Sequence, residues 1–274
     1  MPADLVTQYG LHVIPLWVHS GEQSYRDGVD LMPSQFYPLL ARAPDLPITS
    51  QPSAGEFLDM YRKLARETKV IVSVHISTEL SGTVASALAA RQMFHQVPVH
   101  VVDSRSAAMG LGLIALAAAR AAAEGQNGAQ VAAVAERLVP WTNVLFVVDT
   151  LEYLRKGGRI GGASALAGSV IRIKPILHIH EGRIDALDKV CTRRKALNRL
   201  MEIVAERVRG AGPIHAAVVH AAAPAEAEAL WDRLARTFDC AELHLAELSP
   251  AIGTHVGPGT VSIAFYPTAQ ESGA

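Results

Sequence analysis

Residues 70–76 read VIVSVHI, and residues 81–83 (SGT) then open a helix-forming segment that runs toward Gln92. A continuous apolar, β-branched run is typical of a strand buried on both faces of a parallel sheet. Residues 99–102 (VHVV) repeat this pattern, and an Ala-rich helical stretch follows Ser106. Strands that alternate with helices predict an α/β fold with right-handed crossovers.

Further elements are expected on both sides of this core. On its N-terminal side the sequence predicts a strand over 13–18 and a helix that Ser53 and Glu56 begin as a capping box. On its C-terminal side, Glu181-Gly182 indicates a hairpin turn, and the remaining expected segments are a helix over 193–209 and strands over 144–148, 214–219, 242–248 and 261–266. We therefore predict two domains, a parallel α/β/α sheet in residues 1–140 and a mixed α/β sheet in residues 141–274.

Composition narrows the class of protein. The chain has 274 residues, half of them apolar, and a net charge of −1, so a basic surface for nucleic acid is not expected. The N-terminus shows no signal peptide, and the most apolar stretch, 107–119, is shorter than the roughly 20 residues of a membrane span. Two cysteines, Cys191 and Cys240, without a CxxC pair are typical of thiols in a reducing cytoplasm.

Common catalytic and cofactor motifs do not occur. The sequence has no GxxxxGK[ST] loop, no GxGxxG between a strand and a helix, no GxSxG and no HExxH. His178 and His180 share one strand face, but no further ligands for a metal can be identified, so a solvated strand face is the default. We expect neither a cofactor nor a metal.

Several small polar residues are candidates for binding an anion. Ser81 stands where a helix begins after a buried strand, a position that binds anions, although a plain Ser N-cap is the alternative. Thr49 and Ser50 precede another helix whose cap is Ser53, and these hydroxyls suit a carboxylate or phosphate. His255 lies in a predicted glycine loop over 253–259, where a ligand can approach the backbone closely.

Basic side chains form two further groups. Arg172 and Lys174 point to one face of their predicted strand, with solvent exposure as the alternative. Four cations gather near a helix N-terminus, where the helix dipole disfavours them, which suggests an anionic partner or else a solvated basic patch; they are Arg193, Arg194, Lys195 and Arg199.

Taken together, these segments resemble the DegV family of bacterial fatty-acid-binding proteins. The matching stretches follow the family order over nearly the whole chain: 25–30 (YRDGVD), 49–53 (TSQPS), 80–83 (LSGT), 102–104 (VDS), 154–160 (LRKGGRI), 173–177 (IKPIL) and 255–259 (HVGPG). Each stretch alone is weak evidence for the family, but the occurrence of all seven in the family order makes the resemblance specific.

The resemblance implies a two-domain protein that holds one long-chain fatty acid, with the acyl chain in an apolar tunnel, mainly in the second domain, and the carboxylate between the domains. It implies that Thr49, Ser81 and His255 bind this carboxylate, with Arg172 and Gly82 as additional candidates. It also implies a non-catalytic, cytoplasmic carrier that presents the acid to a separate ATP-binding fatty acid kinase subunit, for acyl phosphate formation. Transient contact with a membrane surface is compatible with this role.

The chain departs from the family pattern at two places. Met1-Pro2-Ala3-Asp4 matches the end of the family's first strand, so we expect that strand to be missing through a misassigned start or trimming. Cys191 replaces an arginine of the basic patch, which puts kinase docking there in doubt. Two alternative functions stay open, namely a hydrolase or transferase with Ser81 as nucleophile, His255 as base and Asp103 orienting it, and a lipid-sensing regulatory module.

Overall fold

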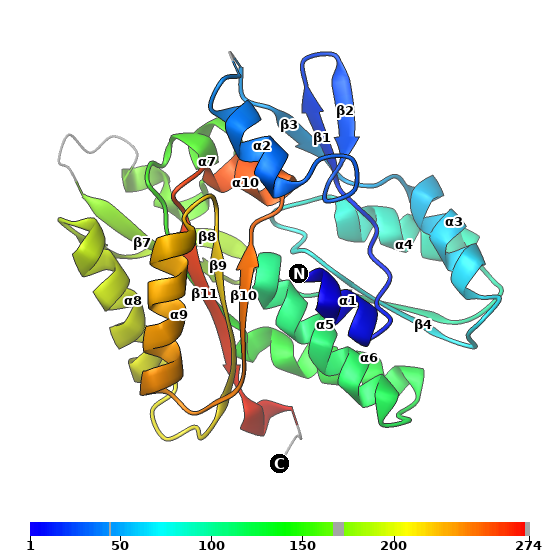
Figure 1. The fold of residues 1–274 in the computed structure, drawn as a ribbon. Helices are drawn as coiled ribbons and strands as arrows, with labels where there is room; N and C mark the ends of the chain where they lie inside the picture. Colours follow the sequence, from blue (N-terminus) through cyan, green and yellow to red (C-terminus); the bar gives the residue numbers. More distant parts are fainter. Residues whose placement is uncertain (44, 167–172, 272–274) are drawn as a thin grey trace.

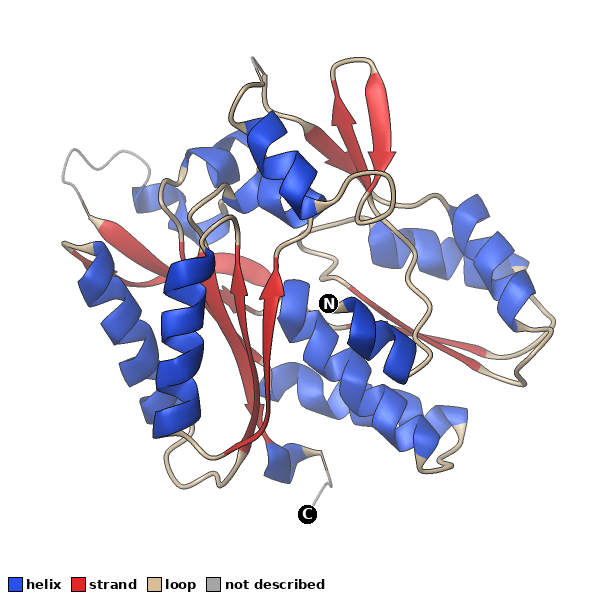
Figure 2. Cartoon of the chain, in the orientation of Figure 1, coloured by secondary structure: helices blue, strands red, loops and turns tan. Residues whose placement is uncertain are grey.

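The computed structural model describes residues 1–43, 45–166 and 173–271, which form three β-sheets and the helices around them (Figures 1 and 2). The α-helices of this described part are α1 (Ala3–Gln8), α2 (Pro33–Leu40), α3 (Ala54–Leu64), α4 (Thr83–Met93), α5 (Ala108–Ala123), α6 (Gly128–Leu138), α7 (Glu152–Lys156), α8 (Arg193–Arg207), α9 (Pro224–Thr237) and α10 (Pro250–Val256). Short 3-10 turns are η1 (Val139–Trp141), η2 (Gly161–Leu166) and η3 (Thr268–Gln270).

A parallel pair of strands confirms the expectation from residues 70–76 and 99–102. Strands β4 (Ile71–His75) and β5 (Val99–Asp103) pair in parallel, with Ile71 opposite Val99. Helices α3 and α4 cover one side, where Phe57, Tyr61 and Ala87 join one buried cluster, and α5 and α6 lie along the other side (Figure 1). The capping box at Ser53 and Glu56 begins α3 as expected.

The second half forms a six-stranded mixed sheet in the order β10-β9-β11-β6-β7-β8. Its strands are β6 (Asn143–Val147), β7 (Lys174–His180), β8 (Arg183–Val190), β9 (Ile214–His220), β10 (Cys240–Glu247) and β11 (Val261–Pro267). Side chains alternate between its faces: Leu145 and Val147 pack toward α8 and α9, whereas Val144 and Phe146 join the core around α5. The α/β class with one parallel and one mixed sheet is thereby confirmed.

The β7–β8 hairpin forms where Glu181-Gly182 predicts it. His180 pairs with Arg183, so the turn has two residues, and φ is +48° at Glu181 and +84° at Gly182. Two positive φ values are typical of a type I′ turn, whose twist matches that of the strands.

Helix α5 packs between the six-stranded sheet and the β4–β5 pair, and its small residues permit this. A Cβ atom on Gly110 would lie 2.4 Å from Cγ2 of Val144 on β6, so only glycine lets the helix approach that strand so closely. A single buried cluster includes Leu113 of α5 and Val144 of β6. The division of the chain at residue 140 therefore stays a prediction, because this core extends across it.

Two expected elements differ from the structure. The strand expected over 13–18 begins only at Trp17, as β1 (Trp17–Ser20), which pairs with β2 (Gln23–Arg26) and β3 (Ile48–Ser50); Pro15 cannot donate a ladder hydrogen bond. The glycine loop expected over 253–259 is wrong for its first half. Residues Pro250–Val256 form α10, which Pro250 can begin as the first helical residue.

Among the described residues, no helix combines the length and apolar character that a membrane crossing requires.

Candidate functional site

A cavity lies between the α5-facing side of the six-stranded sheet and loops from the first half of the chain. Its empty space, counted out to and including its opening into solvent, is about 830 Å³. Most of its lining is apolar: Leu16, Ile76, Leu80, Ala107, Ala108, Val144, Phe146, Ile179, Ile184, Leu248, Ala251, Ile252 and Val256. The polar lining residues are Thr49, Ser50, Gln51, Ser81, Arg159, His255, Thr260 and Ser262.

The expected residues Thr49 and His255 meet in this cavity. Thr49 is the middle residue of β3, where it pairs with Val18 of β1, and His255 lies in the last turn of α10. The Thr49 hydroxyl and Nε2 of His255 are 2.7 Å apart, a hydrogen bond between residues 206 positions apart. The contact thus joins a strand of the first half to a helix of the second.

His255 is a neutral imidazole in this setting. Burial, together with the positive charge of Arg159, lowers the pKa of His255 to about 4. Its Nδ1 atom is buried without a hydrogen-bond partner among the described residues. Because an orphaned buried N–H is rarer than an orphaned acceptor, we place the ring proton on Nε2, which donates to the Thr49 oxygen. The hydroxyl proton of Thr49 is then free to donate to a ligand.

Two glycines allow the close packing that positions His255. A Cβ on Gly157, at the end of α7, would lie 2.3 Å from Nδ1 of His255. At Gly257, just after α10, φ is +73° and a Cβ would lie 2.2 Å from the Tyr153 ring. The stretches 154–160 and 255–259 are therefore one packing unit, in which α7 supports the histidine.

Ser81 lines the cavity but does not cap α4. The helix begins at Thr83 with Gly82 as its N-cap, and no side chain caps it. The Ser81 hydroxyl lies 2.8 Å from that of Thr83 instead, so the N-cap interpretation of Ser81 is wrong. Gly82 lies behind the cavity surface, where a Cβ would be 2.9 Å from the amide nitrogen of Gln51.

The structure thus gathers Thr49, Ser81 and His255 at one cavity, with Gly82 beside it. Arg172 lies outside the described residues. Lys174, on β7, donates to the Asp149 carboxylate at 2.8 Å and does not line the cavity.

Sequence reasoning missed four polar residues of the cavity lining, which are Gln51, Arg159, Thr260 and Ser262. Gln51 and Arg159 stand in stretches that carry the family resemblance, so a sequence signal for these two was present. Arg159 donates from Nε to the Leu80 carbonyl at 3.2 Å and from Nη1 to the Gly157 carbonyl at 2.6 Å. It therefore links the loop that holds Ser81 to the residue that packs on His255.

The geometry disfavours the Ser–His–Asp alternative. Asp103 accepts hydrogen bonds from the Thr78 hydroxyl at 2.6 Å and from the Arg105 backbone N–H at 2.9 Å. Asp103 thus holds residues that follow β4 and β5, and no contact between Asp103 and His255 is found among the described residues. The hydroxyl of Ser50, another anion-binding candidate, forms a hydrogen bond with Nε2 of His19 at 2.8 Å.

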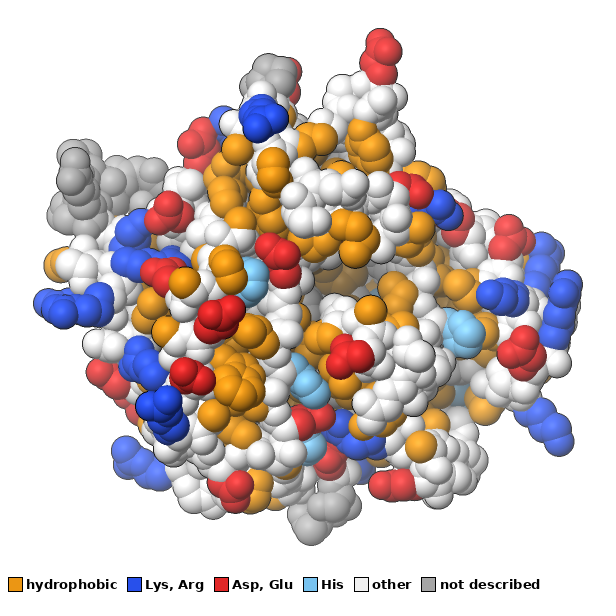
Figure 3. All heavy atoms as spheres, in the orientation of Figure 1, with side chains coloured by type: hydrophobic (Ala, Val, Ile, Leu, Met, Phe, Trp, Pro, Cys, Tyr) orange, Lys and Arg blue, Asp and Glu red, His pale blue; other side chains and the backbone are white. Residues whose placement is uncertain are grey.

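Two of the four cations in the basic patch of α8 are paired with acidic neighbours. Arg193 pairs with Glu226 at 2.7 Å, and Arg199 pairs with Asp188 at 2.8 Å. Figure 3 shows basic and acidic side chains interspersed over the region of α8 and α9. Cys191 is exposed just before this helix. For Arg193 and Arg199, these pairs supply the compensating charge that an anionic partner would otherwise provide.

His178 and His180 stack on one face of β7, with ring centroids 5.3 Å apart. Within the described part of the chain, no group of three or more His, Cys, Asp or Glu could hold a metal ion.

A family model and two related proteins match this chain over nearly its full length. A family model described as "Uncharacterised protein, DegV family" matches residues 1–268. A DegV domain-containing protein of Streptomyces coelicolor is 42% identical over 266 residues, which cover 96% of this chain and 93% of that protein. Protein DegV of Bacillus subtilis is 33% identical over 266 residues, which cover 97% of this chain and 95% of that protein.

Solved structures agree in fold over nearly the full length. A fatty-acid-binding DegV family protein from Thermus thermophilus superposes with a TM-score of 0.92 at 35% identity, covering 97% of this chain and 95% of that one. DegV from Bacillus subtilis, described as a fatty acid binding protein, gives a TM-score of 0.91 at 32% identity, with 98% and 95% covered.

Proposed function

The chain belongs to the DegV family, and from this premise we propose that it binds one long-chain fatty acid in the cavity described above. The observation that carries the proposal is the lining of that cavity, which is mostly apolar and includes the polar residues Thr49, Ser81 and His255. The solved relatives from Thermus thermophilus and Bacillus subtilis are described as binding fatty acids, which supports the same ligand class.

The acyl chain supplies most of the affinity in this proposal. At about 0.8 kcal/mol per buried CH₂, a chain of about 16 carbons gains on the order of 10 kcal/mol before the costs of association. The head group contributes orientation. Thr49 donates its free hydroxyl proton to the carboxylate, Ser81 offers a second hydroxyl, and these bonds offset the loss of hydration. Residues 1–140 would supply Thr49 and Ser81, and residues 141–274 would supply His255 and much of the tunnel.

Native mass spectrometry tests this ligand directly. We expect the purified protein to carry an adduct of one fatty acid per chain, which denaturing extraction then identifies together with its length. A protein that stays empty, even after incubation with palmitic and oleic acid, contradicts the proposal.

We further propose that this chain is the non-catalytic carrier in a two-component reaction. A separate ATP-binding kinase subunit would phosphorylate the bound carboxylate in the cytoplasm, and this chain would present the acid to it. The absence of a GxxxxGK[ST] loop from the sequence is consistent with that division of labour. A lipid-sensing regulatory module is the alternative, and the identity of co-purified partners separates the two.

Trapping with hydroxylamine, which converts an acyl phosphate to a hydroxamate, tests the carrier role. Loaded protein with Mg-ATP alone should give no hydroxamate, and addition of an ATP-binding fatty acid kinase subunit should produce it. Hydroxamate from the chain alone would show that it is itself an enzyme. No hydroxamate with the kinase subunit, despite a bound acid, would contradict presentation while leaving fatty acid binding intact.

A further inference from the structure

We propose that Ser262 gives the apolar part of the cavity a second polar contact, and that the cavity therefore accepts an acyl chain that carries a hydroxyl or oxo group opposite this serine. The proposal rests on the proposed function and deepens it, because it names a subclass of fatty acid. It assigns a role to a lining residue that takes no part in the head-group contacts of Thr49, Ser81 and His255.

The Ser262 hydroxyl is buried and has no protein partner. Ser262 is the second residue of β11, is only 6% exposed, and lines the cavity. Its neighbours Val261 and Ile263 pack on the other face of the sheet, so the Ser262 side chain points to the α5-facing side. Within residues 1–43, 45–166 and 173–271, no group forms a hydrogen bond with this hydroxyl. A buried polar group without a partner is uncommon, and each one calls for an explanation.

The surroundings of this hydroxyl are apolar. Ser262 stands opposite Phe146 of β6, which lines the cavity as well. Thr260, two residues earlier, donates to the carbonyls of Val256 and Gly257, both at 3.0 Å, where α10 ends. The Thr260 hydroxyl is thereby committed to the protein, whereas that of Ser262, roughly 7 Å further along the chain, is available to a ligand.

The first turn of α5 adds to the preference for an oxygen atom. Residues 107–108, where this helix begins, line the cavity, and no side chain caps the helix. The backbone N–H groups of a first helical turn have no intrahelical acceptor and carry partial positive charge, which attracts atoms with lone pairs. Gly110, in the same turn, packs on Val144 of β6, and Val144 stands opposite Ala264, two residues from Ser262. The serine hydroxyl therefore lies near a positive helix end.

A plain hydrocarbon chain cannot satisfy this hydroxyl. When such a chain fills the cavity, it removes water from Ser262 and offers no hydrogen bond in return, so binding bears the cost of an unmade bond. An acyl chain with an oxygen opposite Ser262 supplies the missing acceptor. The same oxygen elsewhere in the apolar lining would itself be left without a partner. The structure thus favours an oxygenated chain at one position and disfavours it at others.

The test compares stearic acid with a positional series of monohydroxystearic acids, from the 3-hydroxy to the 12-hydroxy isomer. Affinities are measured by displacement of a fluorescent fatty acid. For the intact chain, we expect one isomer, or two neighbouring ones, to bind at least as tightly as stearic acid. The remaining isomers should bind about tenfold more weakly, because each buries a hydroxyl without a partner.

Ser262→Ala should remove this preference. The preferred isomer should weaken by about tenfold, to the level of the other isomers, because its hydroxyl loses its partner. Stearic acid should bind as tightly as before, or up to about fivefold more tightly, because no serine hydroxyl is then left unsatisfied.

Ser106→Ala is the matched control. The Ser106 hydroxyl is also buried without a partner among the described residues, but it does not line the cavity. Its affinities for all these acids should equal those of the intact chain.

Two results would overturn the proposal. In the first, the intact chain binds every hydroxy isomer more weakly than stearic acid and by a similar factor, as expected if water stays on Ser262. In the second, Ser262→Ala keeps the preference for one isomer, because another group would then hold its oxygen.

If Ser262→Ala does not fold, Ser262→Gly removes the same hydroxyl without adding volume. Loss of the preference in that variant supports the proposal, and its retention overturns it. An intact chain that binds neither stearic acid nor any isomer contradicts the proposed function itself, which separates that failure from a failure of the role assigned to Ser262.

Discussion

At the scale of single residues, the contact between Thr49 and His255 turns an ordinary strand threonine into a directed donor. With its proton on Nε2, His255 donates a hydrogen bond to the Thr49 oxygen. The hydroxyl proton of Thr49 therefore points away from the histidine. In the proposed complex with a fatty acid, the histidine would act on the ligand through the threonine. The two residues should therefore respond differently to substitution.

Thr49→Val should weaken fatty acid binding by about three- to tenfold, because valine keeps the shape and removes one hydrogen bond, worth about 0.5–1.5 kcal/mol. Thr49→Ser keeps the hydroxyl and should bind within about twofold of the intact chain. Displacement of a fluorescent fatty acid measures both affinities. A serine variant as weak as the valine variant would show that the threonine methyl, rather than the hydroxyl, matters.

His255→Ala should impair acyl phosphate formation more than it impairs retention of the lipid. The apolar tunnel still holds the acyl chain, but Thr49 loses its partner and the carboxylate loses its orientation. The retained lipid is measured by native mass spectrometry and phosphoryl transfer by hydroxamate formation. Equal losses of both, or loss of binding alone, would contradict this prediction.

At the scale of elements, the close packing of α7 against α10 depends on glycine. Gly157→Ala would place a Cβ 2.3 Å from Nδ1 of His255, so the ring must move. We expect a loss of about 1–3 kcal/mol in the free energy of unfolding, as for other overpacked sites, together with weaker fatty acid binding. Urea denaturation and lipid displacement measure the two effects.

Gly55→Ala in α3 is the matched control. A Cβ there meets its nearest atom, the Ser53 oxygen, only at 3.7 Å. Alanine is the better helix former, so this variant should be neutral or up to about 1 kcal/mol more stable. If Gly157→Ala were equally harmless, the packing unit of residues 154–160 and 255–259 would not position His255.

Elements with strong local patterns could be predicted from the sequence, and those set by distant packing could not. The apolar runs of β4 and β5 and the Glu181-Gly182 turn are local signals, and the structure confirms them. In α10, Gly253 suggested a loop. It is a helical residue whose small size admits Tyr37 of α2, with the Tyr37 oxygen 2.8 Å from where a Cβ would lie. Because Tyr37 and Gly253 are far apart in the sequence, no short stretch of residues could have predicted that contact.

The site shows the same limit. Ser81 and Thr49 stand out as hydroxyls beside helix starts, and the resemblance names them together with His255. The bond between Thr49 and His255 joins residues 206 positions apart, and the bridge from Arg159 to Leu80 spans 79 positions. Both arise only when the two halves pack.

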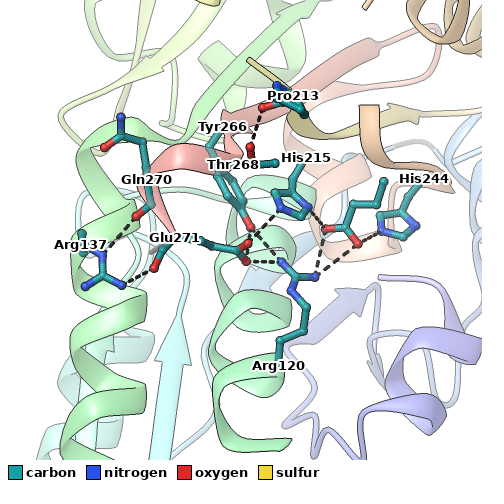
Figure 4. A network of polar contacts seen from close by, with 10 residues as sticks. Arg120, Arg137, Pro213, His215, His244, Tyr266, Thr268, Gln270 and Glu271 are labelled. Atoms are coloured by element: carbon teal, nitrogen blue, oxygen red, sulfur yellow. Dashed lines mark hydrogen bonds and ion pairs between the residues drawn. The ribbon is translucent and has the colours of Figure 1, made fainter. Parts of the chain in front are cut away.

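At the scale of the whole molecule, a half-buried polar network joins the first half of the chain to the C-terminal sheet (Figure 4). Arg120 of α5 pairs with Glu242 of β10 and with Glu271, which follows η3. Nδ1 of His215, on β9, lies 2.8 Å from Glu242, and its Nε2 lies 3.0 Å from Glu271. Both ring nitrogens therefore face carboxylates, which favours the imidazolium. Arg137 of α6 donates to backbone carbonyls of Gln270 and Glu271, so α5 and α6 both hold the C-terminal segment.

The network shifts three pKa values in a direction that ties stability to pH. Burial alone would raise the pKa of Glu242, but hydrogen bonds from His215 and His244 and the charge of Arg120 hold that pKa well below its usual range. Burial likewise opposes ionisation of Glu271, yet His215 and Arg120 lower its pKa to about 2. Burial lowers the pKa of His215, and its bonds to the two carboxylates outweigh this and raise it.

The sign of the pH dependence follows for each group. The carboxylates contribute stability above their unfolded pKa of about 4.3, and this contribution is lost as pH falls through their lower folded values. His215 contributes stability fully below its unfolded pKa of about 6.5 and loses it as pH rises through its raised folded value. Their joint contribution is therefore largest between about pH 4.5 and 6.5.

Glu242→Gln tests this network. The Arg120 and Glu242 side chains are only 22% and 17% exposed, so solvent screens their interaction little. Because Glu271 remains as a partner for Arg120, we expect a loss of about 1–3 kcal/mol in the free energy of unfolding at pH 6. The loss should shrink at pH 3. There Glu242 is protonated in the unfolded chain, so its carboxylate contributes less to the stability of the intact protein, and its replacement removes less. Urea denaturation at both pH values measures it, with Glu136→Gln, at an exposed position of α6, as the control. A loss that is as large at pH 3 as at pH 6 would mean that Glu242 acts through packing and not through its charge.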